Sequence, residues 1–239
     1  MLPAPDPFES HSMLLKIPSV LLPEEVQHLR KVLAETQWVD GNVTSGVQSA
    51  LAKNNLQVPE DAPEAKALGV IVLRALGGNA MFNSACLPLR VFPPLFNRYD
   101  QGMGFDAHVD NSIRYIAAAR QRVRTDVSAT LFLSDPSEYD GGELVIEDTY
   151  GEQSVKLNAG DMVIYPADSL HRVELVTRGS RWASFFWIQS MVREDRDREL
   201  LFRLDRSITL CREELGDKHP GILGMTSSFH SLMRKWADL

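Results

Sequence analysis

The fold of this chain is decided by residues 160–190, GDMVIYPADSLHRVELVTRGSRWASFFWIQS. Three runs rich in β-branched and aromatic residues follow one another here, at 161–165, 170–176 and 181–189. Turn residues separate the runs, and we interpret the pair Arg178-Gly179 as the last turn. The stretch therefore predicts three consecutive short strands.

The same pattern of short strands reaches back to residue 95. Five further candidates come before the quoted stretch, at 95–99, 104–109, 127–133, 143–147 and 153–157. Eight short strands at this spacing predict a closed barrel or a double-sheet jelly roll. We interpret the intervening segment 111–125, which carries four arginines, as a loop or a short helix over one end.

Helical patterns flank this β region on both sides. One predicted helix opens at Pro23, and a second runs from Pro63 to about Leu76. Residues 36–58 between them are polar and are predicted to be irregular. After Val192 an apolar stripe recurs at helical spacing and is expected to pack on the β region; it consists of Leu200, Leu201, Leu204 and Ile208. A last helix is expected around 228–236.

The predicted fold class is therefore mainly β with flanking helices, around a double-stranded β-helix (jelly-roll) core. The division of the chain that we expect is a disordered extension or expression scar at 1–12, an N-terminal helical and irregular support region at 13–88, the jelly-roll core at 89–191 and a C-terminal helical region at 192–239.

Composition narrows the class of protein further. The chain has 239 residues, 44% hydrophobic and 24% charged, as in ordinary soluble globular proteins. A net charge of -7 argues against nucleic acid as a partner. The two cysteines, Cys86 and Cys211, form no zinc pattern or disulfide framework. Because the sequence also lacks a long apolar run and a signal peptide, we expect a cytoplasmic protein with no membrane partner.

The first candidate functional residues are His108 and Asp110, which are two positions apart in GFDAHVDNSI, residues 104–113. Positions i and i+2 of a strand share a face, so this pair forms an ion pair or holds a metal jointly. His171 follows 63 residues after His108, on a later predicted strand. Two histidines and one carboxylate on one side of an ion form the facial triad of non-haem Fe(II) oxygenases.

Arg181 adds a cation ten residues after His171, in an apolar predicted strand. A buried cation needs an anion, and a guanidinium binds a carboxylate through two parallel hydrogen bonds. A 2-oxo acid that chelates iron would carry such a carboxylate into the barrel. The constellation therefore indicates an iron site with a 2-oxo acid cosubstrate.

The order His108-Val109-Asp110, His171, Arg181 resembles the HxD…H…R/K pattern of Fe(II)/2-oxoglutarate-dependent dioxygenases. Three phrases are similar to the PKHD-type hydroxylases, relatives of the prolyl 4-hydroxylase branch: NRYDQGMGFDAHVDNSIR at 97–114, SATLFLSDPSEYDGGELVIED at 128–148, and the stretch 160–190 quoted above. The resemblance covers roughly residues 13 to 239.

The resemblance implies a role for five residues. His108, Asp110 and His171 would be the iron ligands, and Arg181 would pair with the distal carboxylate of 2-oxoglutarate. Tyr99 would place its hydroxyl on the cosubstrate, although it also fits as a core tyrosine. The implied reaction uses Fe(II), 2-oxoglutarate and O2, with ascorbate as a reductant, and releases succinate and CO2. The hydroxylated group would be a prolyl or other amino-acid side chain, on a small molecule, peptide or protein.

Two other classes of function fit parts of the sequence. A cupin-like metal-binding or sensing module without turnover would use the same ligands. A zinc hydrolase is disfavoured because no HExxH motif is present.

The segment 111–125 carries a loose cluster of four arginines: Arg114, Arg120, Arg122 and Arg124. They form either a solvated face or, if they lie at a barrel mouth, a contact for an acidic substrate.

Overall fold

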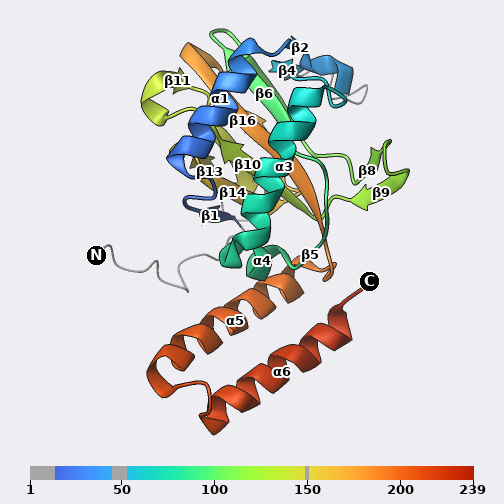
Figure 1. Ribbon diagram of the computed structural model, residues 1–239, viewed down its shortest axis with the longest axis vertical. Helices are drawn as coiled ribbons and strands as arrows, with labels where there is room; N and C mark the ends of the chain where they lie inside the picture. The colour runs from blue at the N-terminus through green and yellow to red at the C-terminus, as the bar shows by residue number, and fades with distance from the viewer. Residues whose placement is uncertain (1–13, 45–52, 149–150) are drawn as a thin grey trace.

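The computed structural model describes residues 14–44, 53–148 and 151–239 (Figure 1). The extension expected at 1–12 lies outside these residues. No single helix among them is long and apolar enough to cross a membrane; only the bent pair α3 (Pro63–Gly78) and α4 (Ala80–Cys86), at 84° to each other, reaches that length and composition when taken together.

Two antiparallel sheets build the core. The larger follows the order β1-β14-β10-β16-β6-β4-β2, with β5 and β11 also paired to β16. Its strands are β1 (Leu15–Ile17), β2 (Val39–Asp40), β4 (Leu56–Gln57), β5 (Pro88–Val91), β6 (Leu95–Asp100), β10 (Val127–Phe132), β11 (Tyr139–Gly141), β14 (Met162–Pro166) and β16 (Val176–Ser190). The smaller sheet, β13-β12-β15-β7-β3, contains β3 (Lys53–Asn54), β7 (Gly104–His108), β12 (Leu144–Asp148), β13 (Gly151–Val155) and β15 (His171–Val173).

The two sheets pack face to face, as the predicted jelly roll requires. Phe132 and Val163 of the larger sheet share one buried cluster with Leu144, Ile146 and Val173 of the smaller one. Alternate residues of the larger sheet point the other way, because successive strand side chains face opposite sides. The prediction of a mainly β core with flanking helices is confirmed.

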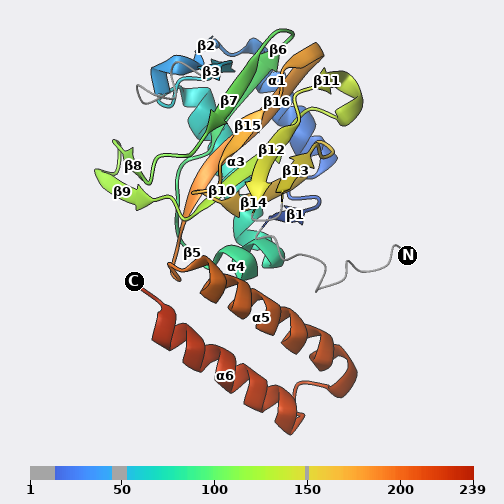
Figure 2. The ribbon, with the colours of Figure 1, turned by 180° about the vertical axis from the view of Figure 1, so that it is seen from behind.

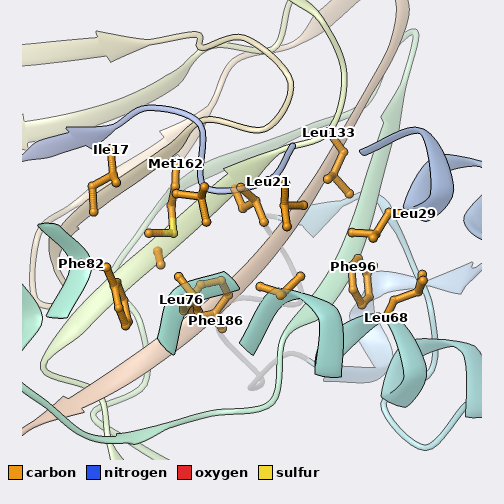
Figure 3. Close-up of a cluster of buried hydrophobic side chains, with 14 of the residues drawn as sticks. Ile17, Leu21, Leu29, Leu68, Leu76, Phe82, Phe96, Leu133, Met162 and Phe186 are labelled. Carbon is orange, nitrogen blue, oxygen red and sulfur yellow. The ribbon is translucent and has the colours of Figure 1, made fainter. Parts of the chain in front are cut away.

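Helices cover the outer face of the larger sheet. They are α1 (Pro23–Glu35), α3 and α4. Figure 3 shows Leu29, Leu68 and Leu76 from these helices beside Phe96 and Phe186 of the sheet, in the largest apolar cluster of the described residues. The helices predicted at Pro23 and Pro63 are thus confirmed, and α4 was missed because it follows α3 after one residue.

The C-terminal region is a helical hairpin of α5 (Asp195–Leu215) and α6 (Pro220–Trp236), which projects from one end of the core (Figures 1 and 2). Leu201 is buried with Leu87 and Val192. Of the rest of the predicted stripe, Ile208 is buried and Leu204 is half-buried, but Leu200 is 49% exposed, so the prediction that Leu200 packs on the β region was wrong. The reason is that α5 packs against the helices α4 and α6 and not flat on a sheet. Two helices cover a narrower part of the α5 surface than a sheet would.

Two irregular segments proved to be ordered strands. The segment 111–125 forms a separate antiparallel pair, β8 (Ile113–Ile116) and β9 (Gln121–Arg124), and not the expected loop or short helix. Buried Val123 fixes this hairpin against Phe92 and Trp187. In the segment 36–58, the described residues form β2, the 3-10 turn η1 (Gly41–Thr44), β3 and β4. Short polar strands at sheet edges carry little periodic signal.

The turn expected at Arg178-Gly179 is absent, because β16 runs through both residues. Tyr139 and Asp140 of β11 pair with Gly179 and Arg178, and the register shifts before Gly141, which is the mark of a bulge. Gly141, at the shift, has φ +71°, and Gly179, which lies just outside it, has φ +73°, so glycines supply the left-handed backbone on both strands. The 3-10 turn η2 (Pro136–Glu138) leads into β11 and brings the Glu138 carbonyl close to Gly179.

We expect Gly179→Ala to lower the free energy of unfolding by more than the about 1–3 kcal/mol that a strained left-handed residue costs. An added Cβ would also lie 2.0 Å from the Glu138 carbonyl oxygen. Gly216→Ala is the matched control, because φ is +80° there and no atom lies within 4 Å of the added Cβ. Urea unfolding of both variants measures the difference; equal losses would show that the close approach contributes nothing.

Candidate metal centre

The register of the smaller sheet brings the two predicted histidine ligands together. His108 ends β7 and His171 begins β15, and the two residues are direct partners across the antiparallel pair. Their ring centroids are 4.3 Å apart. Asp110 lies just beyond the end of β7, so it does not share a strand face with His108 as the spacing had suggested. It nevertheless reaches the same point, with Oδ2 3.8 Å from His171 Nε2.

The three side chains form the one group of potential metal ligands found in the described part of the chain. One ligand atom from each of His108, Asp110 and His171 lies within 4.8 Å of the others. Two imidazoles and one carboxylate are the donors that non-haem Fe(II) sites use. The donor set therefore fits ferrous iron.

Hydrogen bonds orient each ligand from behind. His108 Nδ1 lies 2.8 Å from the Asp106 carbonyl, and His171 Nδ1 lies 3.0 Å from the Ser169 carbonyl. A carbonyl only accepts, so each Nδ1 carries the proton and each Nε2 keeps a free lone pair for a metal. Ser128 Oγ donates to Asp110 Oδ2 at 2.6 Å, which fixes the carboxylate although it lies outside regular structure.

The protonation state of His108 also suits a ligand. Burial, followed by the neighbouring His171, lowers the pKa of His108 from 6.5 to about 4. Phe105, stacked on the imidazole at 3.5 Å between centroids, contributes to this burial. The ring is therefore neutral at physiological pH, as metal binding requires.

This lowered pKa predicts how the stability of the iron-free protein depends on pH. Above pH 6.5 the ring is neutral in the folded and unfolded states, so it adds no dependence. Between pH 6.5 and about 4 the unfolded chain binds a proton that the folded protein does not, so stability falls as the pH falls. We expect the wild-type Tm, measured with a chelator, to fall relative to that of His108→Gln across this window. Parallel curves would contradict the shift.

Arg181 lies in the same cavity as the triad, on β16. His108, Asp110 and His171 line this cavity together with Arg181. Arg181 is 1% exposed, and its Nε has no hydrogen-bond partner among the described residues. Its guanidinium lies over the rings of Tyr99 and Phe132, at 5.4 and 5.2 Å from their centroids. A buried cation with an unused donor beside a metal site fits an anionic ligand of the metal.

Tyr99 is the register partner of Arg181 on β6 and lines the same cavity. Burial raises the pKa of the Tyr99 hydroxyl, although the guanidinium of Arg181 opposes the rise. The phenol therefore stays protonated and able to donate a hydrogen bond. The structure brings all five predicted site residues around one cavity.

Sequence reasoning missed several polar residues of this cavity, among them Ser128, Lys53 and Arg114. Ser128 was detectable, because it is a hydroxyl in a strand that is buried along its whole length. Lys53 lies in the polar segment that was predicted to be irregular, so no pattern marked it. Arg114 was noted only as one of four arginines in 111–125. In the structure it is the one of the four that lines the cavity.

Comparison with known proteins agrees with this geometry. Residues 94–189 match the family described as the 2OG-Fe(II) oxygenase superfamily, and residues 195–238 match the PKHD-type hydroxylase C-terminal domain. PKHD-type hydroxylase GOX0559 of Gluconobacter oxydans is 65% identical over 227 residues, which cover 95% of this chain and all of that protein. The chain belongs to the PKHD-type hydroxylases.

Solved structures of other proteins share the fold of this PKHD-type hydroxylase. A prolyl-4-hydroxylase from Pseudomonas putida is 20% identical, with a TM-score of 0.53, over 75% of this chain and 94% of that one. HygX from Streptomyces hygroscopicus, solved with nickel, 2-oxoglutarate and hygromycin B, is 18% identical, with a TM-score of 0.52, over 75% and 83%. Both share the fold.

Membership of the family settles the class of reaction. This PKHD-type hydroxylase is an Fe(II)- and 2-oxoglutarate-dependent hydroxylase with a His-Asp-His facial triad. The prediction of a hydroxylase with these two cofactors is confirmed, and the alternatives of a binding module without turnover and of a zinc hydrolase are set aside.

Proposed function

We propose that this hydroxylase binds Fe(II) through His108, Asp110 and His171, binds 2-oxoglutarate through Arg181 and Tyr99, and hydroxylates an amino-acid side chain such as that of a prolyl residue. The observation that carries the proposal is the single cavity in which the triad and the buried guanidinium meet. A 2-oxo acid has a chelating end for the metal and a distal carboxylate for the arginine.

When bound, the iron supplies the activation of O2 and the oxidative decarboxylation of 2-oxoglutarate that drive hydroxylation of a C–H bond. The chain's own residues orient the reactants. Arg181 would pair with the distal carboxylate, and Tyr99 would add a neutral hydrogen-bond donor from the neighbouring strand. Ser128 and the two backbone carbonyls hold the side chains of Asp110, His108 and His171 in place, so these three residues would hold the iron.

Apolar side chains form part of the cavity wall. Phe185 and Trp187 of β16 and Val173 of β15 line the same cavity as the metal ligands and Arg181. Apolar walls weaken the screening of charges inside the cavity and keep side reactions low. They also suit the aliphatic part of an amino-acid side chain.

The choice of substrate rests on analogy with the Pseudomonas putida prolyl-4-hydroxylase, whose likeness to this chain is one of fold. A screen of amino acids, peptides and metabolites tests it. With Fe(II), 2-oxoglutarate and O2, we expect a substrate to gain the mass of one oxygen as succinate forms. Turnover confined to substrates without an amino-acid side chain would contradict the proposal. The use of ascorbate as a reductant and a location in the cytoplasm stay predictions.

A further inference from the structure

A second buried phenol, that of Tyr139, lies close to Arg181. Tyr139 begins β11 and is fully buried, and Arg181 on β16 is 1% exposed. Strand pairing places Tyr139 opposite Gly179, two residues before Arg181, whereas Tyr99 of β6 lies directly opposite Arg181. Two phenols therefore approach the same guanidinium from two different strands.

The backbone at Gly142 shows how closely Tyr139 and Arg181 approach one another. A Cβ added at Gly142 would lie 3.1 Å from Tyr139 Cε2 and 3.2 Å from Arg181 Cδ. Cε2 is bonded to the ring carbon that carries the hydroxyl, and Cδ is bonded to Nε. The bare glycine thus lets the polar end of the tyrosine and the start of the guanidinium pack against the same point of the chain.

The two polar ends are complementary and both are unpaired. Tyr139 Oη and Arg181 Nε each lack a hydrogen bond of normal geometry to any described residue. Burial raises the pKa of the Tyr139 hydroxyl, and the charge of Arg181 opposes the rise, so the phenol is neutral and lies within reach of the guanidinium. An acceptor and a donor that are buried side by side gain by pairing, because leaving both unpaired is unfavourable.

Tyr139 is itself held in place by Lys156. The ammonium lies 4.1 Å from the centroid of the Tyr139 ring and donates hydrogen bonds to the carbonyls of Tyr139 and Gly141, at 2.9 and 3.2 Å. Glu143 lies 3.5 Å from the same ammonium and offsets its charge. Ring and backbone of Tyr139 are therefore fixed independently of any ligand in the cavity.

The guanidinium needs such a contact because its aromatic neighbours do not fix it fully. The rings of Tyr99 and Phe132 pack beside it and restrain its plane, but cation–π attraction leaves its edge free to turn within that plane. Arg181 lines the cavity and Tyr139 does not, so the hydroxyl approaches from outside the cavity. A hydrogen bond from Nε to this hydroxyl would leave the two terminal nitrogens for the two oxygens of a carboxylate.

We propose that Tyr139 is a positioning residue for the cosubstrate: its hydroxyl accepts a hydrogen bond from Arg181 Nε and so aims the terminal nitrogens at the distal carboxylate of 2-oxoglutarate. The inference rests on the proposed function, because it requires Arg181 to bind that carboxylate. It gives the two phenols different roles. Tyr99 lines the cavity and would contact the cosubstrate directly, whereas Tyr139 acts through the arginine.

The test is the variant Tyr139→Phe, which removes the hydroxyl and keeps the ring. Calorimetry on the full chain, saturated with Fe(II) and free of oxygen, measures the affinity for 2-oxoglutarate. We expect it to fall about tenfold, since a hydrogen bond to a charged group is worth about that factor. Binding of 2-oxobutanoate, which lacks the distal carboxylate, should not change. Wild-type affinity for 2-oxoglutarate, or an equal loss for both acids, would overturn the proposal.

A second background shows whether the hydroxyl acts through the guanidinium. In Arg181→Lys a carbon replaces Nε, so adding Tyr139→Phe should cause no further loss of 2-oxoglutarate affinity. Tyr99→Phe is the comparison, because a direct contact with the cosubstrate should be lost in both backgrounds. If Tyr139→Phe costs the same factor with arginine and with lysine at position 181, the hydroxyl does not work through Arg181 and the proposal is refuted.

Arg181→Ala separates a failure of this inference from a failure of the proposed function. If Arg181→Ala binds 2-oxoglutarate like wild type, the proposed role of Arg181 is wrong and that of Tyr139 is wrong with it. If Arg181→Ala loses affinity and Tyr139→Phe does not, the role of Tyr139 alone is refuted. Thermal unfolding and Fe(II) affinity are measured on the same samples, and both should match wild type in Tyr139→Phe.

Discussion

Replacing His171 with alanine is expected to abolish 2-oxoglutarate-dependent succinate formation, with a loss of more than about 100-fold in iron affinity. Changes to groups that only support a metal ligand cost about 10–100-fold, so loss of a ligand from a three-ligand site must exceed that range. The same result is expected for His108→Ala and Asp110→Ala, because each supplies one of the three clustered ligand atoms. Titration of the apo-protein with Fe(II) under anaerobic conditions measures the affinity.

Asp106→Ala is the matched control for these variants. Asp106 lies on the same strand as His108, two residues earlier, but its side chain is exposed and only its backbone carbonyl contacts the imidazole. Iron affinity should therefore be retained. If any one of the three ligand variants binds iron like wild type, that residue is not a ligand.

Arg181→Ala is expected to weaken 2-oxoglutarate binding by about 30-fold to several thousandfold and to spare iron binding. Truncating one partner of a buried, hydrogen-bonded charge pair costs about 2–5 kcal/mol, which corresponds to that range. Arg181→Lys should recover part of the affinity, because an ammonium keeps the charge but loses the bidentate geometry. The measurement is the 2-oxoglutarate affinity of iron-saturated protein without oxygen.

A neighbouring arginine provides the control. Arg178 lies on the same strand, but its side chain is 57% exposed and pairs with Asp140 on the surface. Arg178→Ala should bind 2-oxoglutarate like wild type. A 2-oxo acid without a distal carboxylate should bind wild type and Arg181→Ala equally weakly. Wild-type affinity for 2-oxoglutarate in Arg181→Ala would show the arginine to be structural.

Local patterns were sufficient for the parts of the fold that have strong periodicity. The strands around 95–99, 127–133 and 161–165 were predicted within one or two residues of β6, β10 and β14. Most side chains of these strands are buried on both faces of the sheet, so apolar residues form clear runs in the sequence. The hairpin β8–β9 lacked that signature. Val123 is the only buried residue among its eight, and the others are half-buried or exposed.

The pair Arg178-Gly179 was ambiguous, because the same residues occur in a turn and in a strand next to a bulge. Arg178-Gly179 has the composition of a turn, yet β16 continues through it because β11 pairs with both residues. A left-handed glycine serves either structure. Which of the two forms depends on whether a partner strand lies alongside, and that partner comes from a segment about 40 residues earlier in the chain.

The sequence by itself was sufficient to select the residues that we propose as metal ligands and as the cosubstrate arginine, because HxD, His171 and Arg181 are specific in type and order. Only the tertiary structure decided how they meet. Strand pairing places His108 opposite His171, and Ser128 on a different sheet holds Asp110, which lies outside the strand. The fold also selected Lys53 and Arg114 from among many surface cations. Burial and the sharing of one cavity depend on contacts between distant segments, which no local pattern encodes.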